Sequence, residues 1–235
     1  MKLIFLDVET TGLDEEDRLC EVAYKTDCSV GYRDRQLFKP PVPIKVGAMA
    51  VSHITNKMVE DMPSFEGSPM EEQLKKFAAE GYVLVAHNAP FDLKMLAKEG
   101  IVFDKYIDTK KMSHALDIDM DMESHRLQYL RYFYGIELQN AVAHSAEGDV
   151  DVLVAVYHKL HELLEKPSVE ELVALSAKPV LYTKFKFGKY NGNYIAHVAS
   201  VNPGYLEWML NEKRKSGESN EDDWIYTLEH FLNNV

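Results

Sequence analysis

A short β-prone segment that runs directly into two acidic side chains is the feature that most restricts the fold. The segment Lys2–Asp7 is apolar between its ends, and the chain continues as Asp7-Val8-Glu9-Thr10-Thr11-Gly12. Because side chains alternate along a strand, Asp7 and Glu9 share a face, about 7 Å apart. Two carboxylates this close repel each other unless a cation or a shared proton lies between them. Hard oxygen ligands suit Mg²⁺ or Mn²⁺, so the pattern predicts a metal site at a strand end, against the alternative of a solvated strand end.

A second acidic group follows a compact apolar strand predicted at Tyr82–Ala86. The sequence there reads His87-Asn88-Ala89-Pro90-Phe91-Asp92 and continues as a helix that Gly100 ends. Either His87 or Asn88 can cap this helix and Pro90 suits its first turn, which places Asp92 close to the strand end. The alternative is that Asp92 only complements the helix dipole.

A third group reads His144-Ser145-Ala146-Glu147-Gly148-Asp149 at the start of a helix predicted over Glu147–Leu164. A separation of five residues, part loop and part helix, lets His144 and Asp149 reach one point. A histidine and an aspartate at this spacing are more often structural when they stand alone. Together the three groups offer one histidine and four carboxylates to a single site: His144, Asp7, Glu9, Asp92 and Asp149.

The order of the elements predicts an α/β fold in two parts. Alternating segments at Leu19–Thr26 and Tyr32–Phe38 indicate two further strands, after which helices and strands alternate. This order favours a mixed sheet flanked by helices. The Lys166-Pro167-Ser168 segment marks a boundary, so we expect one domain over 1–166 and a small C-terminal α+β domain over 167–235. Its β part is a hairpin predicted at Phe185–Tyr194.

The distribution of charge points to one basic region in an acidic chain. Lys and Arg number 26 and Asp and Glu number 38, a formal charge of −12 that repels nucleic acids and anionic lipid unless a local feature reverses it. Residues 172–206 contain no acid but hold Lys184, Lys186 and Lys189 between aromatic residues. Their alternation predicts Phe185 and Phe187 in a core and the lysines outside, where they can contact phosphates.

Two classes of protein are excluded by pattern. No 18-residue apolar segment occurs, so we expect neither a transmembrane helix nor a membrane partner, and the first residues do not form a signal peptide. The two cysteines, Cys20 and Cys28, lack metal-ligand spacing and predict a reduced, cytoplasmic protein.

The three acidic motifs, in this order, resemble the DEDDh family of 3′–5′ exonucleases, which have a ribonuclease H-like fold. The resemblance covers about residues 1–165. The segments 184–192 and 202–208 resemble the C-terminal region of a DNA-degrading branch of that family. The resemblance implies a ribonuclease H-like mixed sheet flanked by helices.

The same resemblance implies a reaction. Asp7, Glu9, Asp92 and Asp149 would hold two divalent cations, Mg²⁺ or Mn²⁺, and His144 would take a proton from the attacking water. The enzyme would hydrolyse phosphodiester bonds at DNA 3′ ends, single-stranded or duplex, and release nucleoside 5′-monophosphates. Such an activity belongs to DNA repair or proofreading.

Further substrate contacts are implied around the metal site. Backbone amides of Thr10, Thr11 and Gly12 would hold the terminal 3′-OH, and Leu13 would wedge against the last base. Asn88 is a further candidate contact. Two candidates keep an alternative: His53 either contacts the terminal nucleotide or caps a helix, and Phe91 either stacks on a base or packs under its helix.

Two other functions remain open at this point. An RNA-trimming exoribonuclease of the same superfamily would carry the same motifs, because the 2′-OH is recognised by details outside them. A non-catalytic, polymerase-associated module on the same scaffold is the third reading, which the intact acids and His144 argue against. A homodimer or an association with a polymerase is compatible with the sequence.

Overall fold

The computed structural model describes residues 1–27, 31–138, 146–216 and 222–234. Five strands form one mixed sheet in the order β3-β2-β1-β4-β5. The strands are β1 Leu3–Thr10, β2 Leu19–Thr26, β3 Arg33–Leu37, β4 Val83–Ala86 and β5 Tyr106–Asp108. β2 pairs antiparallel with β1 and with β3, whereas β4 pairs parallel with β1 and with β5. The predicted mixed sheet is therefore confirmed, and β1 at its centre continues beyond Asp7 to include Glu9.

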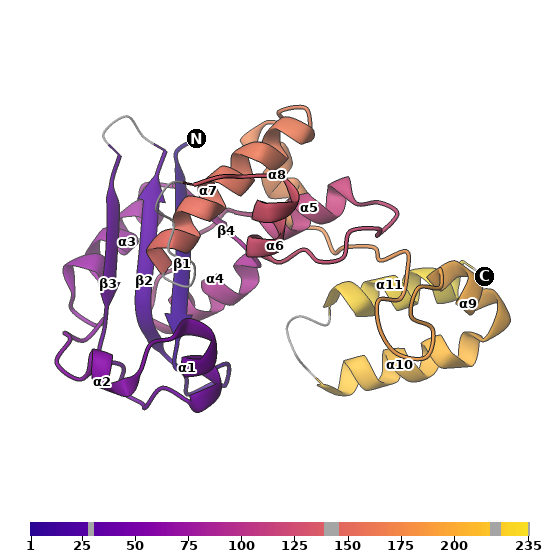
Figure 1. The fold of residues 1–235 in the computed structure, drawn as a ribbon, viewed down its shortest axis with the longest axis horizontal. Helices are drawn as coiled ribbons and strands as arrows, with labels where there is room; N and C mark the ends of the chain where they lie inside the picture. The colour runs from indigo at the N-terminus through magenta and orange to yellow at the C-terminus, as the bar shows by residue number, and fades with distance from the viewer. Residues whose placement is uncertain (28–30, 139–145, 217–221, 235) are drawn as a thin grey trace.

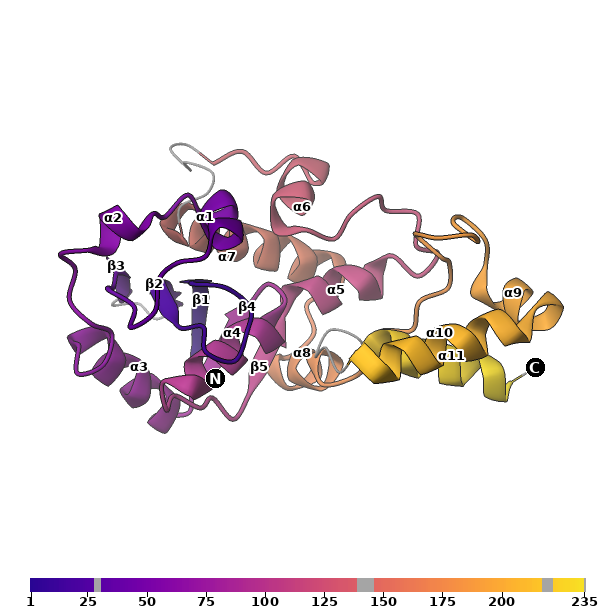
Figure 2. The same cartoon turned by 90° about the horizontal axis from the view of Figure 1, so that it is seen from below.

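Helices cover both faces of this sheet (Figures 1 and 2). One face packs against α3 and α4, and the other packs against α5, α6, α7 and α8. Short helices α1 and α2 lie near the sheet end where β1 stops (Figure 1). The bounds are α1 Val46–Ser52, α2 Asn56–Val59, α3 Pro69–Ala79, α4 Ala89–Lys98, α5 Thr109–Leu116, α6 Leu127–Phe133, α7 Ala146–Leu163 and α8 Val169–Ser176. Within the described ranges, no helix combines the length and the hydropathy that crossing a membrane requires.

The alternation of β1 decides which layer each residue joins. Ile4, Leu6 and Val8 belong to the core under α3 and α4. Leu3 and Phe5 belong to the core under α7, so the odd-numbered side chains that follow them point to the α7 face. Asp7 and Glu9 are the next odd positions, and α7 contacts β1 directly.

The C-terminal part has a separate small core beside the sheet domain (Figure 2). It is built from α9 Ile195–Val201, α10 Pro203–Ser216 and α11 Asp222–Asn233. The expected hairpin is reduced to one isolated antiparallel bridge, between Lys184 and Tyr194. The predicted α+β character of this part is therefore wrong in its β component, because turns close the loop between these residues and leave no ladder.

The boundary between the two parts lies within a region of contacts. The division into 1–166 and 167–235 stays a prediction. Helix α8 falls in the second range, yet Leu172 packs in the core under α7 and the Ser176 hydroxyl accepts the backbone N–H of Asp108 at 2.8 Å. Beyond α8, the Lys184 ammonium pairs with Asp121 at 2.5 Å and joins the small core to the sheet domain.

Candidate active site

Two carboxylates of β1 and one of α7 meet at the end of the central strand. β1 pairs with β4 only as far as Phe5, so its last residues extend beyond that partner. Asp149 lies in the first turn of α7, which crosses this face. Ligand oxygens of Asp7, Glu9 and Asp149 all lie within 4.8 Å of one another. Three of the four acids expected from the sequence are therefore gathered at one point, and all three are half-buried.

Asp92 approaches the same point from the opposite layer. It lies in the first turn of α4 and is almost fully buried. The backbone N–H of Val8, between the two β1 acids, bonds to its carboxylate. Asp92 is also the largest charged neighbour acting on Asp7, although it lies outside the group of three that share the 4.8 Å limit.

The electrostatics of this cluster call for a cation. Burial, followed by the charges of Asp92, Glu9, Asp149 and Glu21, holds the pKa of Asp7 well above its usual range. Burial, then Glu21 and Asp149, raises the pKa of Glu9 to about 7. The largest influences on these two groups all raise the pKa, and none of them is a cationic side chain. Carboxylate oxygens at this spacing fit Mg²⁺ or Mn²⁺ in both chemistry and charge.

A fifth acid, Glu21, lies beneath the cluster. It faces Glu9 in the antiparallel register between β2 and β1 and is 1% exposed. Arg35 of β3 binds its carboxylate at 2.5 Å. Glu21 was not among the residues predicted from the sequence, although an acid between the apolar residues Cys20 and Val22 of a predicted strand is the signal that reveals it.

Gln128 is a second residue that sequence reasoning missed. This side chain of α6 donates from Nε2 to Asp149 Oδ1 at 2.5 Å. Its Oε1 atom is buried and has no hydrogen-bond partner among the described residues. Gln128 therefore fixes the orientation of one carboxylate of the cluster. No local motif announces it, because the contact joins two helices 21 residues apart in the chain.

The loop that follows β1 is held by a buried carboxylate. Asp17 is 0% exposed and accepts hydrogen bonds from the Thr11 hydroxyl, the Asp14 backbone and the Lys45 ammonium, each at 2.7 Å. These bonds together lower the pKa of Asp17 against the effect of its burial. A Cβ atom on Gly12 would lie within 3 Å of both Asp17 and Lys45, so this position requires glycine.

This loop presents one apolar side chain to solvent beside the acids. Leu13 is 76% exposed, whereas Thr10 and Thr11 are buried. The backbone N–H of Thr11 already donates to the Arg18 carbonyl at 2.9 Å. The Thr11 amide therefore has a partner within the loop, and the contact of the Thr10–Gly12 amides with a substrate hydroxyl stays a prediction.

The other residues predicted to act at the site lie in different environments. Phe91 is partly buried and packs against the core under α4, in agreement with the packing alternative. Asn88 has the left-handed backbone φ of 70° and does not cap α4 with its side chain, which instead accepts a bond from Lys110 at 3.2 Å. His53 is exposed and ends α1 at a φ of 59°. His144 lies outside the described residues.

The three lysines of the C-terminal segment also differ. Lys184 is occupied by its ion pair with Asp121, and Lys189 lies over the Tyr190 ring at 5.2 Å. Lys186 is exposed and donates to the Met122 carbonyl at 3.3 Å. Phe185 is fully buried, but Phe187 is 42% exposed. The prediction of a buried Phe187 is therefore wrong, because residues 185–187 do not form a strand and do not alternate as one.

Comparison with known proteins agrees with this geometry. An exonuclease family model, RNase T, matches residues 4–157, and the model of the exodeoxyribonuclease X-like C-terminal region matches residues 185–214. Exodeoxyribonuclease 10 of Escherichia coli strain K12 is 29% identical over 99% of this chain and 100% of its own length. The DNA polymerase III subunit epsilon of Treponema pallidum is 32% identical over 64% of this chain and 72% of that protein.

Solved structures share the fold. Exonuclease X in complex with 5′-overhanging duplex DNA superposes with a TM-score of 0.60 at 23% identity, covering 74% of this chain and 99% of that one. E. coli exonuclease I in complex with a dA16 oligonucleotide superposes with a TM-score of 0.53 at 19% identity, covering 69% and 41%. Both likenesses identify a common architecture for the sheet domain.

Proposed function

Because the chain belongs to the RNase T exonuclease family, we propose that it is a metal-dependent 3′–5′ exodeoxyribonuclease. It removes nucleoside 5′-monophosphates from DNA 3′ ends in repair or proofreading. The observation that carries this proposal is the group of Asp7, Glu9 and Asp149 oxygens within 4.8 Å of one another, with Asp92 bonded to the strand between them. Similarity over nearly the whole chain to a deoxyribonuclease supports DNA over RNA.

The acids hold the cofactor in this proposal. Asp7, Glu9, Asp92 and Asp149 would supply oxygen ligands for two divalent cations, and Gln128 keeps the Asp149 carboxylate in place. When bound, the cations would supply positive charge that attracts the phosphodiester and would lower the pKa of a water molecule. Glu21 adds negative charge below the ligands and thereby strengthens their preference for a cation.

The remaining steps use His144 and Leu13. His144 precedes Asp149 by five residues and takes the proton of the attacking water, a role that suits an imidazole with a pKa near neutrality. The exposed Leu13 side chain stacks against the terminal base, and the Asp17 network holds its loop in position. The hydrolysis places the water oxygen on phosphorus and releases the 3′ oxygen of the preceding nucleotide.

End-labelled substrates test this function. Single-stranded DNA, duplex DNA with an overhang and RNA are incubated with Mg²⁺ or with chelator. We expect loss of a 3′ label first, mononucleotide products with a 5′ phosphate, and no reaction in chelator. Faster release from RNA would assign the chain to the ribonucleases, and a persisting 3′ label would contradict the polarity.

Two variants test the residues. Asp149→Asn should reduce nucleotide release by at least a thousand-fold while the far-ultraviolet circular dichroism stays unchanged, on the order of what removing a catalytic group costs. Asp61→Asn is the control, since Asp61 is an exposed acid outside the cluster. His144→Ala should lower the rate by about 100- to 10,000-fold and flatten its pH profile near neutrality. Full activity of either would remove that residue from the mechanism.

A further inference from the structure

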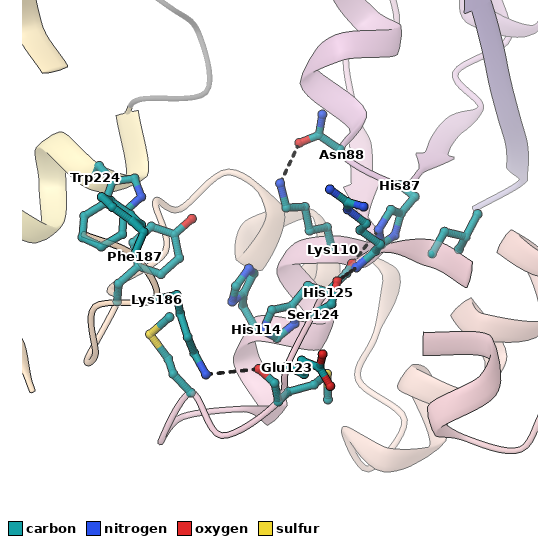
Figure 3. A pocket seen from close by; sticks show the side chains of 15 residues that line it. His87, Asn88, Lys110, His114, Glu123, Ser124, His125, Lys186, Phe187 and Trp224 are labelled. Atoms are coloured by element: carbon teal, nitrogen blue, oxygen red, sulfur yellow. Dashed lines mark hydrogen bonds between the residues drawn. The ribbon is translucent and has the colours of Figure 1, made fainter. Parts of the chain in front are cut away.

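A second pocket lies between the sheet domain and the C-terminal part, and none of the acids assigned above lines it. Its volume is about 510 Å³, within the range of small-ligand sites. One wall comes from the sheet domain with Lys110, His114 and His125, and the other comes from the C-terminal part with Lys186, Phe187 and Trp224 (Figure 3). The pocket therefore forms only where the two parts meet.

Contacts between the two parts fix this arrangement. Beside the ion pair of Lys184 with Asp121, the Thr183 hydroxyl donates to the Ile118 carbonyl at 3.1 Å. The Lys186 ammonium donates to the Met122 carbonyl at 3.3 Å, across the pocket rim. The segment 117–126 thus joins both walls, and the lining side chains are held at defined positions.

The lining is basic in a chain with a charge of −12. Lys110, Arg126 and Lys186 all line the pocket, against the single acid Glu123. None of the three cations forms an ion pair within the described ranges, and the hydrogen bonds of Lys110 and Lys186 go to neutral oxygens of Asn88 and Met122. Positive charge that no ion pair within the described ranges neutralises is available to an anion.

The position of Lys110 strengthens this argument. It lies in the first turn of α5, which has no acid there. The helix dipole disfavours a cation at that end, and the charge of Lys110 acts on the buried Asp108 carboxylate that caps the helix without forming an ion pair with it. The imidazoles beside it do not add charge: burial and then the neighbouring His125 lower the pKa of His114 to about 3.

The other component of the lining is aromatic. Phe187 is 42% exposed and meets the Trp224 ring edge-to-face at 5.1 Å. Figure 3 shows both rings facing the basic wall across the pocket. Cations that track a phosphate chain, combined with exposed rings on which bases stack, are how proteins hold single-stranded nucleic acid. An apolar partner surface would leave the three cations without charge complements, and an acidic one would make no use of the exposed rings for stacking.

We propose that this pocket binds one unpaired nucleotide of the DNA substrate, its phosphate between Lys110, Arg126 and Lys186 and its base against Phe187. The inference rests on the proposed function, since it names a second point, distinct from the acids, at which the protein binds the same substrate. His87 and Asn88, which directly precede the helix that carries Asp92, line the near end of the pocket. In this proposal, a strand whose 3′ end lies at the acids extends past this segment to the pocket.

Binding without catalysis tests the proposal. Fluorescence anisotropy measures the affinity for labelled oligothymidylates of about 4 to 16 nucleotides in chelator, the range of site sizes for single-strand binders. The combined variant Arg126→Gln and Lys186→Gln should bind more weakly, and its slope of log affinity against log salt should fall by about 1.4, since each single-strand phosphate contact contributes about 0.7. Phe187→Ala should weaken binding by about 5- to 150-fold through lost stacking. Lys76→Gln on α3, which removes one positive charge on the opposite side of the sheet, should leave both the affinity and the salt slope unchanged (Figure 1).

Two further experiments distinguish failure of the pocket proposal from failure of the proposed function. Hydrolysis of a dinucleotide, whose two nucleotides both flank the scissile bond at the acids, should keep its rate in the pocket variants. If the full chain hydrolyses no substrate, the proposed function fails while the anisotropy still decides whether the pocket binds a strand. An unchanged affinity and salt slope in the combined variant would overturn the pocket, as would equal loss in Lys76→Gln. Oligouridylate serves as the RNA arm, and tighter binding of RNA than of DNA would overturn the assignment to a DNA strand.

Discussion

The substitution Glu9→Gln separates the contribution of the acid cluster to nuclease activity from its cost to folding stability. Burial, Glu21 and Asp149 raise the pKa of Glu9 from 4.5 to about 7. That difference of about 2.5 units, at 1.36 kcal/mol per unit, corresponds to at most about 3.4 kcal/mol. Because the acids titrate together and water reaches them, we expect Glu9→Gln to stabilise the metal-free protein by about 2 kcal/mol. Glutamine keeps the shape of the side chain and opens no cavity.

The effect has a defined pH window. Below pH 4.5, Glu9 is protonated in both the folded and the unfolded chain, and its charge costs nothing. Between pH 4.5 and about 7 the unfolded chain releases the proton first, so unfolding becomes easier as pH rises. Above pH 7 both states are charged and the full cost is present. The gain in stability from Glu9→Gln is therefore expected at pH 8 and is almost entirely lost at pH 4.5.

Thermal unfolding in chelator measures this gain. The midpoint of Glu9→Gln should exceed that of the parent protein by about 4–8 °C at pH 8 and match it at pH 4.5. Nuclease activity and the stabilisation that Mg²⁺ gives the parent protein should be lost together. Glu60→Gln is the matched control, since Glu60 is an exposed acid at the end of α2. A midpoint for Glu9→Gln at or below the parent value at pH 8 would refute the reasoning that the cluster is a site of unrelieved repulsion.

Two further substitutions probe the support of the site. Gly12→Ala places a Cβ 2.4 Å from Asp17 Oδ2, so the loop must shift; we expect a loss of about 2–3 kcal/mol of stability by denaturant titration, together with slower hydrolysis. Gln128→Leu removes the donor to Asp149; we expect a 10- to 100-fold loss of activity that added Mg²⁺ partly restores.

The control outcomes differ between these two variants. Gly47→Ala is the comparison for Gly12→Ala, because a Cβ on Gly47 meets nothing within 4 Å and should leave stability unchanged or raised. For Gln128→Leu, a loss of activity that Mg²⁺ concentration does not affect would assign Gln128 to folding rather than to the positioning of a ligand.

Local sequence reasoning succeeded where backbone geometry alone decides the outcome. The twofold alternation of a strand placed Asp7 and Glu9 on one face, and β1 confirms that they share the face of Leu3 and Phe5. Helix periodicity and N-terminal signals placed Asp92 in the first turn of α4. The mixed sheet followed from the order of strands and helices. These features depend on residues within a few positions of one another, so the order of residues in the sequence is enough to predict them.

The sequence by itself thus determined the mixed sheet, the family and the acids that the chain brings to a strand end. Only the tertiary structure decided the supports of those acids: the register that sets Glu21 against Glu9, the helix pair that joins Gln128 to Asp149, and the exposure of Phe187. It also decided that Lys186, and not Lys184, stands at a pocket between the two parts. The physical reason is that covalent geometry repeats locally, whereas these contacts depend on how distant segments pack.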